Sequence, residues 1–201
     1  MEKRRFIFLD IDGVLNHDAW YDYLHKTYSP AELRKWGFNK YNISPKSTKL
    51  LNQLKGCEVI ISSSWFYDDK TVEGLKNAGL KLPIIGGTIH NSLNDKSLCR
   101  GNDIAKWFID NNIDEDPPQD LFLHRRGKHN DNWYHTRCHY DYINGVEYFV
   151  IEEGDVAYTY VIIDDYNDML FQQQEHFVYI DNRIGLTQAD IDKAKKILNL
   201  C

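Results

Sequence analysis

Continuous apolar runs mark most of the strands that this sequence predicts. Residues 5–9 (RFIFL) and 59–61 (VII) contain no alternating polar positions, which is typical of strands covered on both faces. Further short strands are predicted in LPIIGG (82–87), YTYVIIDD (158–165) and VYID (178–181). These runs are separated by polar segments long enough to hold helices.

Helices are predicted between the strands by capping residues and apolar stripes. The clearest is SPKSTKLLNQLKG (44–56), where Ser44 is the cap, Pro45 occupies the first turn and Gly56 ends the helix. Similar patterns predict helices in residues 69–79, in RGNDIAKWFIDNN (100–112) with a cap at Asn102 or Asp103, and in residues 187–200. Residues 17–43 are predicted to be irregular apart from a short helix in SPAELRKWG (29–37).

Alternating strands and helices predict an α/β fold, a doubly wound parallel sheet of the Rossmann-like kind. We expect a single domain over residues 1–201, with residues 17–43 as a small flap and no large cap. Residues 112–157 break the alternation. There Asn144-Gly145 lies between two runs of strand-forming residues, so we expect an inserted loop or β-hairpin.

Composition restricts the partners and the cellular compartment that we expect for the protein. The formal net charge of -6 lacks the overall basic character of a non-specific nucleic-acid binder. Four scattered cysteines without a CxxC pair favour reduced thiols, and no apolar run approaches the roughly 20 residues of a membrane span. The short apolar run near the N-terminus does not have the length of a signal peptide. We therefore expect a cytoplasmic protein that does not contact membranes.

Polar residues cluster where three of the predicted strands end. The clusters are Asp10 with Asp12, Ser62–Ser64, and Asp164 and Asp165 with Asp168. In doubly wound sheets, ligands bind outside the carboxyl ends of the strands, so the clusters are expected to converge. Carboxylates gathered in one crevice repel one another unless a hard cation such as Mg²⁺ lies among them, and serine hydroxyls suit phosphate oxygens. Taken singly, each cluster could instead be a turn or a helix cap.

Four segments in chain order carry a resemblance to a known superfamily. FLDIDGVLN, VIISSSW, RGNDIAKWF and VIIDDYNDM resemble the four motifs of the haloacid dehalogenase superfamily, the first and fourth more specifically than the others. Within it, they are similar to the phosphatase domains of Swiss Army Knife RNA-repair proteins. The resemblance covers residues 5–111 and 158–190 and implies a phosphatase with a Rossmann-like core.

The resemblance implies roles for the acidic residues. Asp10 matches the nucleophile that forms an aspartyl-phosphate, and Asp12 matches the general acid that protonates the leaving oxygen and then helps to activate water. Mg²⁺ would be held by the Asp10 carboxylate, the Asp12 backbone carbonyl and either Asp164 or Asp165. Asp168 is expected to support the site without binding the ion.

For the second and the third motif, two residues each match the phosphate-binding position that the resemblance implies. The hydroxyl of the second motif is Ser62 or Ser63. The cation of the third motif, usually Lys in the superfamily, is Arg100 or alternatively Lys96. An arginine can contact a phosphate through two nitrogens at once. Three further residues are candidates for shaping the pocket, Gly13, Asn16 and Trp65, although Trp65 fits a place in the core equally well.

These observations predict a Mg²⁺-dependent phosphomonoesterase, a hydrolase with nucleotidase or RNA-repair character. Its expected substrate is a terminal phosphate of a nucleotide or a nucleic-acid end. The alternatives are a phosphatase of small metabolites, such as mononucleotides or sugar phosphates, and a non-catalytic phosphate-binding module. Basic residues within 124–139 could contact RNA or DNA phosphates, or form a solvated loop. The sequence leaves the oligomeric state open.

Overall fold

A five-stranded parallel sheet forms the core of the protein. The computed structural model describes residues 4–35, 43–67, 70–88, 99–111, 137–143, 146–152 and 158–200. The strands lie in the order β3-β2-β1-β6-β7, and every neighbouring pair is parallel. Their bounds are β1 Arg4–Leu9, β2 Glu58–Ile61, β3 Ile84–Gly87, β6 Tyr158–Asp164 and β7 Phe177–Tyr179. The predicted α/β fold with a doubly wound parallel sheet is confirmed.

Helices cover both faces of this sheet, which explains the continuous apolar runs. On one face, α6 (Arg100–Asp110) packs its Trp107 and Phe108 rings against Phe6 and Phe8 of β1. The alternate residues of β1, Ile7 and Leu9, belong to the cluster on the other face. That face is covered by α4 (Pro45–Leu51), α5 (Lys70–Asn77) and α8 (Gln188–Ile197). Because Phe6–Leu9 of β1 are buried on both faces, this part of the strand is apolar at every position.

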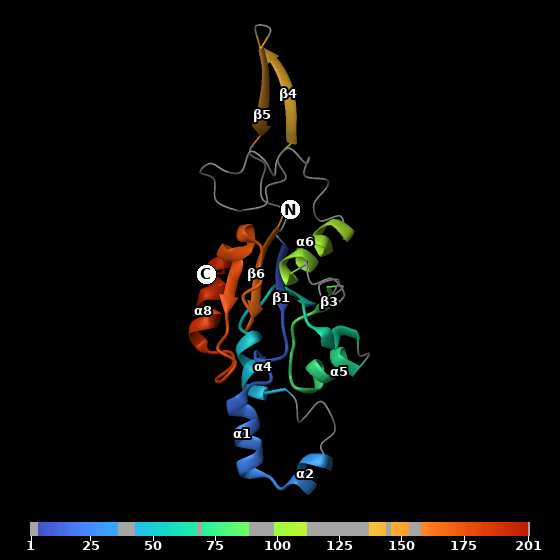
Figure 1. Ribbon diagram of the computed structural model, residues 1–201, viewed down its shortest axis with the longest axis vertical. Helices are drawn as coiled ribbons and strands as arrows, with labels where there is room; N and C mark the ends of the chain where they lie inside the picture. Colours follow the sequence, from blue (N-terminus) through green and yellow to red (C-terminus); the bar gives the residue numbers. More distant parts are fainter. Residues whose placement is uncertain are drawn as a thin grey trace.

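The two ends of the sheet carry different additions. Helices α1 (Asp18–Thr27) and α2 (Pro30–Lys35) lie beyond the carboxyl ends of the strands, toward the bottom of Figure 1. Strands β4 (Arg137–Ile143) and β5 (Val146–Glu152) lie at the opposite end, beyond the start of β1. The carboxyl ends are where the polar clusters of the sequence occur.

The insertion between α6 and β6 contains an antiparallel hairpin, as the Asn-Gly pair predicts. Ile143 of β4 pairs with Val146 of β5, so residues 144–145 connect the strands. Those two residues lie outside the described residues, as do residues 124–136 of the basic segment. Of that segment, the structure describes the backbone of residues 137–139, which belongs to β4.

The structure differs from the predicted helices in two places. Residues 18–27, expected to be irregular, form the helix α1, in which Leu24 is buried and most of the other side chains are exposed. Helix α6 begins at Arg100 rather than after a cap at Asn102 or Asp103. The reason is that the Asn102 side chain accepts from the Cys99 N–H at 2.9 Å, which places Asn102 inside the first turn. Arg100 is therefore the first residue of the helix.

His17 caps helix α1 and ties it to the end of the sheet. Its Nδ1 accepts a hydrogen bond from the Trp20 N–H at 3.2 Å, which is possible while that nitrogen is unprotonated. The ring is buried against Gly185, where a Cβ would clash with it. Burial lowers the pKa of His17, and the charge of Lys46 lowers it further.

We expect the cap to make stability depend on pH in mildly acidic solution. Since the pKa of His17 in the folded protein lies below its ordinary value of 6.5, its contribution to the free energy of unfolding is complete above that value and is lost as the pH falls through the lower folded pKa. Loss of an N-cap hydrogen bond costs about 1 kcal/mol. Urea unfolding at several pH values would measure how the free energy of unfolding changes with pH. His17→Asn keeps a capping side chain that does not titrate and should flatten this slope; an equal slope in both proteins would contradict the prediction.

Among the described residues, no helix combines the length and apolar character needed to cross a bilayer.

Candidate active site

Asp10 lies at the centre of the carboxyl edge of the sheet. It directly follows β1, and its backbone N–H donates to the Ile163 carbonyl of β6 at 3.0 Å. The residue is 3 % exposed. Because β1 is the central strand, Asp10 is flanked by the residues that end β2 on one side and β6 on the other.

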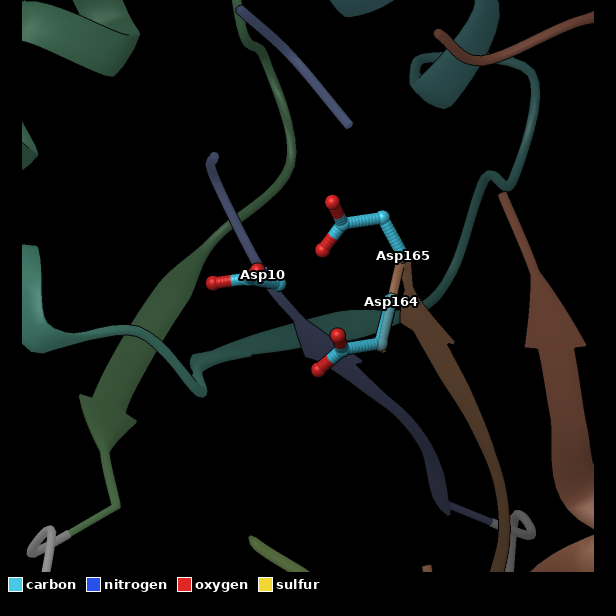
Figure 2. A group of neighbouring side chains, drawn as sticks. All are labelled: Asp10, Asp164 and Asp165. Carbon is cyan, nitrogen blue, oxygen red and sulfur yellow. The ribbon is translucent and has the colours of Figure 1, made fainter. Parts of the chain in front are cut away.

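Three carboxylates meet at this position. Asp10, Asp164 and Asp165 each offer an oxygen, and these oxygens all lie within 4.8 Å of one another. Figure 2 shows the three side chains gathered where β1 and β6 end. Asp164 is fully buried, whereas Asp165 is partly exposed. Both residues of the fourth motif therefore contribute to the cluster.

Arg100 reaches this cluster from the first turn of α6. Its Nη1 lies 3.0 Å from Asp10 Oδ1 and donates to Asp164 Oδ2 at 2.8 Å. The same nitrogen donates to the Ser62 carbonyl at 2.8 Å. These three contacts with described residues all use one nitrogen, so in them Arg100 acts as a point charge rather than as a two-pronged donor. Lys96, the alternative cation, lies outside the described residues.

The start of α6 is fastened to the segment that follows β6. Asp168 Oδ2 accepts from the Arg100 backbone N–H at 3.1 Å. The buried Gln173 side chain donates to the Gly101 carbonyl at 2.9 Å and accepts from the Leu170 N–H at 3.0 Å. A Cβ on Gly101 would clash with Gln173 and Leu170, so a glycine is needed there. Asp168 thus touches the backbone of Arg100 and holds the helix start that carries its guanidinium.

Ser62 and Ser63 occupy different positions at the end of β2. Ser63 is buried, and its hydroxyl hydrogen-bonds the Asp10 carboxylate. The Ser62 hydroxyl is also buried and has no hydrogen-bond partner among the residues that the structure describes. A buried polar atom without a partner is uncommon and is consistent with a position that a ligand satisfies. Both candidates for the second-motif hydroxyl therefore lie beside Asp10.

Asp12 differs from the other acidic residues because it is exposed. Its Oδ1 accepts from Asn16 Nδ2 at 2.7 Å, and its Oδ2 accepts from Trp65 Nε1 at 2.9 Å. The Asp12 carboxylate is therefore held by donors from two segments, outside the buried cluster. It is not one of the three carboxylates whose oxygens lie within 4.8 Å of one another, although burial raises the pKa of Asp165 and the charge of Asp12 contributes to the rise.

Gly13 allows the chain to turn tightly under the cluster. Its φ of +70° is strained for other residues, and a Cβ there would clash with the Asp165 carboxylate and lie 2.9 Å from the Asn182 Cβ. The Asn182 side chain hydrogen-bonds Asp165. Asn182 was not among the predicted site residues, although it follows β7, the neighbour of β6, at the same edge of the sheet.

The electrostatics of the cluster favour a bound cation. Burial raises the pKa of Asp164 to about 8, with the charge of Asp10 adding to the rise and Arg100 opposing it. Burial likewise raises the pKa of Asp10, against the opposing effects of Arg100, the Ile11 N–H and Ser63. Arg100 brings one positive charge to three carboxylates. A divalent cation would relieve the remaining repulsion.

A parallel sheet with carboxylates gathered at its carboxyl edge is the arrangement that the resemblance to the haloacid dehalogenase superfamily implies. More particularly, the chain belongs to the family described as the HAD domain in Swiss Army Knife RNA repair proteins, whose model matches residues 6–120, more than half of the chain. The family indicates a phosphatase-type hydrolase. Comparison with curated proteins and with solved structures finds no match.

The matched range and the structure complement each other. Residues 6–120 include Asp10, Asp12 and Arg100 but end before Asp164. The pairing of β1 with β6 and the 2.8 Å contact between Arg100 and Asp164 join the fourth motif to the matched part of the chain.

Proposed function

We propose that the protein is a Mg²⁺-dependent phosphomonoesterase that works through an aspartyl-phosphate on Asp10. The observation that carries this proposal is the buried Asp10 carboxylate with a cation, Arg100, 3.0 Å from its Oδ1. A nucleophile of this kind splits one difficult displacement into two easier ones. The proposed substrate is a terminal phosphate of a nucleotide or of a nucleic-acid end.

The residues present fit Mg²⁺. The ion prefers oxygen ligands, and the cluster of Asp10, Asp164 and Asp165 offers three carboxylate oxygens within 4.8 Å of one another. These residues, with the Asp12 backbone carbonyl, would hold the ion. When bound, it supplies positive charge beside the transferring phosphoryl group.

The first step transfers the phosphoryl group to Asp10. An oxygen of Asp10 attacks phosphorus while the bond from phosphorus to the leaving oxygen breaks, and Asp12 gives its proton to that oxygen. Arg100 lies where it neutralises charge on the phosphoryl oxygens beside Asp10, because its Nη1 already contacts Asp10 and Asp164. The Ser62 or Ser63 hydroxyl would donate to the same oxygens.

The second step releases phosphate. Asp12, now ionised, takes a proton from a water molecule whose oxygen attacks the phosphorus of the aspartyl-phosphate. The bond from phosphorus to Asp10 breaks, which restores the Asp10 carboxylate and frees inorganic phosphate. Asp12 suits both steps because it is exposed to water while Asp10 is buried.

The proposed substrate class rests on the family and on access to the site. The family description names RNA repair proteins, which act on nucleic acid. Over the carboxyl edge of the sheet, the structure describes the small helices α1 and α2 and no large cap among the described residues. A site covered in this way admits the end of a polymer as well as a free nucleotide.

Phosphate release from a matched panel tests the proposal. The panel contains mononucleotides, sugar phosphates, and RNA and DNA oligonucleotides with 5′- or 3′-phosphates, each assayed with Mg²⁺ and with EDTA. We expect release that EDTA abolishes and Mg²⁺ restores, with oligonucleotide ends preferred. Preference for free nucleotides or sugar phosphates would keep the chemistry and reject the nucleic-acid substrate. Absence of release from every compound in the presence of Mg²⁺ would reject the enzyme and favour a phosphate-binding module.

A further inference from the structure

Both oxygens of the Asp12 carboxylate accept hydrogen bonds from side chains that the proposed chemistry does not use. Trp65 Nε1 donates to Oδ2 at 2.9 Å, and Asn16 Nδ2 donates to Oδ1 at 2.7 Å. Two donors on two different oxygens fix the plane of a carboxylate, whereas a single donor would let it rotate about its bond to Cβ. The orientation of Asp12 is therefore set by its neighbours.

Both donors are themselves held in place. Asn16 is 4 % exposed, and its Oδ1 accepts from the Gly13 N–H at 3.0 Å. Trp65 belongs to the short 3₁₀ helix η1 (Ser64–Tyr67), which follows the serines at the end of β2. Its carbonyl accepts from the buried Thr71 hydroxyl at 2.5 Å, and its ring packs against the core cluster beneath α4 and α5. A rigid donor is one that can orient its acceptor.

We propose that Trp65 is a positioning residue for the general acid, and that its indole N–H aims the Asp12 carboxyl at the leaving oxygen of the substrate. This inference rests on the proposed function, because it presumes the proton transfer assigned to Asp12. It gives the tryptophan that ends the SSSW segment two roles. The ring packs against the hydrophobic core, and the indole N–H orients the general acid.

The hydrogen bond leaves Asp12 able to react. Each carboxyl oxygen has two acceptor sites, so an oxygen that accepts from Trp65 or Asn16 keeps one site for a proton or for water. In the first step the O–H bond of Asp12 breaks and its proton moves to the leaving oxygen as the bond from phosphorus to that oxygen breaks. The geometry of this transfer, rather than the attack by Asp10, is what Trp65 controls.

The dependence on the leaving group separates this role from a structural one. A nucleoside monophosphate releases a basic alkoxide that needs a proton, whereas p-nitrophenyl phosphate releases an anion that is stable near neutral pH. For Trp65→Phe we expect kcat/KM to fall about 10- to 100-fold with the nucleoside monophosphate, part of the gain that general acid catalysis supplies. With p-nitrophenyl phosphate we expect kcat/KM to change less than about threefold, because that leaving group needs no acid.

The value of kcat/KM is the right quantity because it reports the steps up to the first irreversible one, which includes departure of the leaving group. Trp20→Phe is the matched control. It makes the same chemical change on α1, where Trp20 stacks on Tyr23, and should leave the ratio between the two substrates unchanged. Equal losses on both substrates for Trp65→Phe would overturn the proposal, as would no loss on either.

A measurement without substrate tests the contact itself. In an NMR spectrum, the indole N–H signal of Trp65 can be assigned by its disappearance in Trp65→Phe. The chemical shift of this signal should change in Asp12→Ala. It should stay unchanged in Asp22→Ala, a change at an exposed carboxylate of α1. A signal that stays in place in Asp12→Ala would also overturn the proposal. Failure of the proposed function looks different: Asp10→Asn would keep full activity, or the wild-type protein would release no phosphate. Either result removes the reaction in which Trp65 is given a part and overturns the inference together with it.

Discussion

Asp10→Asn is expected to lower the rate of phosphate release by about 10⁴-fold or more, the scale of loss seen when a catalytic nucleophile is removed. The amide matches the carboxyl in size but is a far weaker nucleophile, so the aspartyl-phosphate cannot form. Substrate binding should persist, because Arg100 and the two serines that follow β2, Ser62 and Ser63, remain beside the site.

Steady-state release and rapid-quench trapping of labelled protein would measure the effect together. Wild-type protein should carry acid-stable, hydroxylamine-sensitive label during turnover, and Asp10→Asn should carry none. Asp22→Asn, a change to an exposed carboxylate on α1, is the control and should behave as wild type. Activity of Asp10→Asn within about tenfold of wild type would refute the covalent mechanism, since a lost nucleophile costs far more.

Arg100→Met is expected to lower kcat by about 10²- to 10³-fold, the usual cost of removing one group that stabilises developing charge. The side chain is also the cation that contacts both Asp10 and Asp164. Removing one partner of a buried ion pair destabilises a fold by about 3–5 kcal/mol, so thermal unfolding must be followed alongside activity. Mg²⁺ should recover part of that stability by supplying charge to the same carboxylates.

Arg100→Lys separates charge from shape. All three contacts of Arg100 described above come from Nη1, so an ammonium could replace much of the interaction if it reaches the same place. We expect Arg100→Lys to retain more activity than Arg100→Met at equal folded fraction. Arg34→Met, on the exposed side of α2, controls for loss of a surface charge. Equal activity of Arg100→Met and wild type would rule out a role for this cation.

The strands of the core were predictable because burial on two faces leaves a plain pattern. Phe6 and Phe8 face α6 while Ile7 and Leu9 face the opposite layer, and an uninterrupted apolar run is the direct result. Helix α1 was not predictable in the same way. Its cap is His17, which is not one of the preferred capping residues, and most of its side chains apart from Leu24 are exposed, so the usual start signal and a wide buried face are missing.

The start of α6 shows how a local signal can be ambiguous. Asn102 is a good capping residue by type, yet its side chain turns back to the Cys99 N–H from within the helix. The error of two residues matters for function, because the true boundary puts Arg100 in the first turn. Its backbone N–H can then be held by Asp168, from a segment far away in the chain.

The sequence by itself determined the class of fold and the kinds of side chain at the carboxyl edge of the sheet, since strand runs, caps and the order of polar clusters are local patterns. Only the tertiary structure decided the pairings within the site. It brought Arg100 to Asp10, gathered Asp164 and Asp165 into one cluster with Asp10, and paired Asp12 with Trp65 and Asn16. The physical reason is that charge and hydrogen-bond geometry act over a few ångströms in space, between segments whose separation along the chain carries no record of their contact.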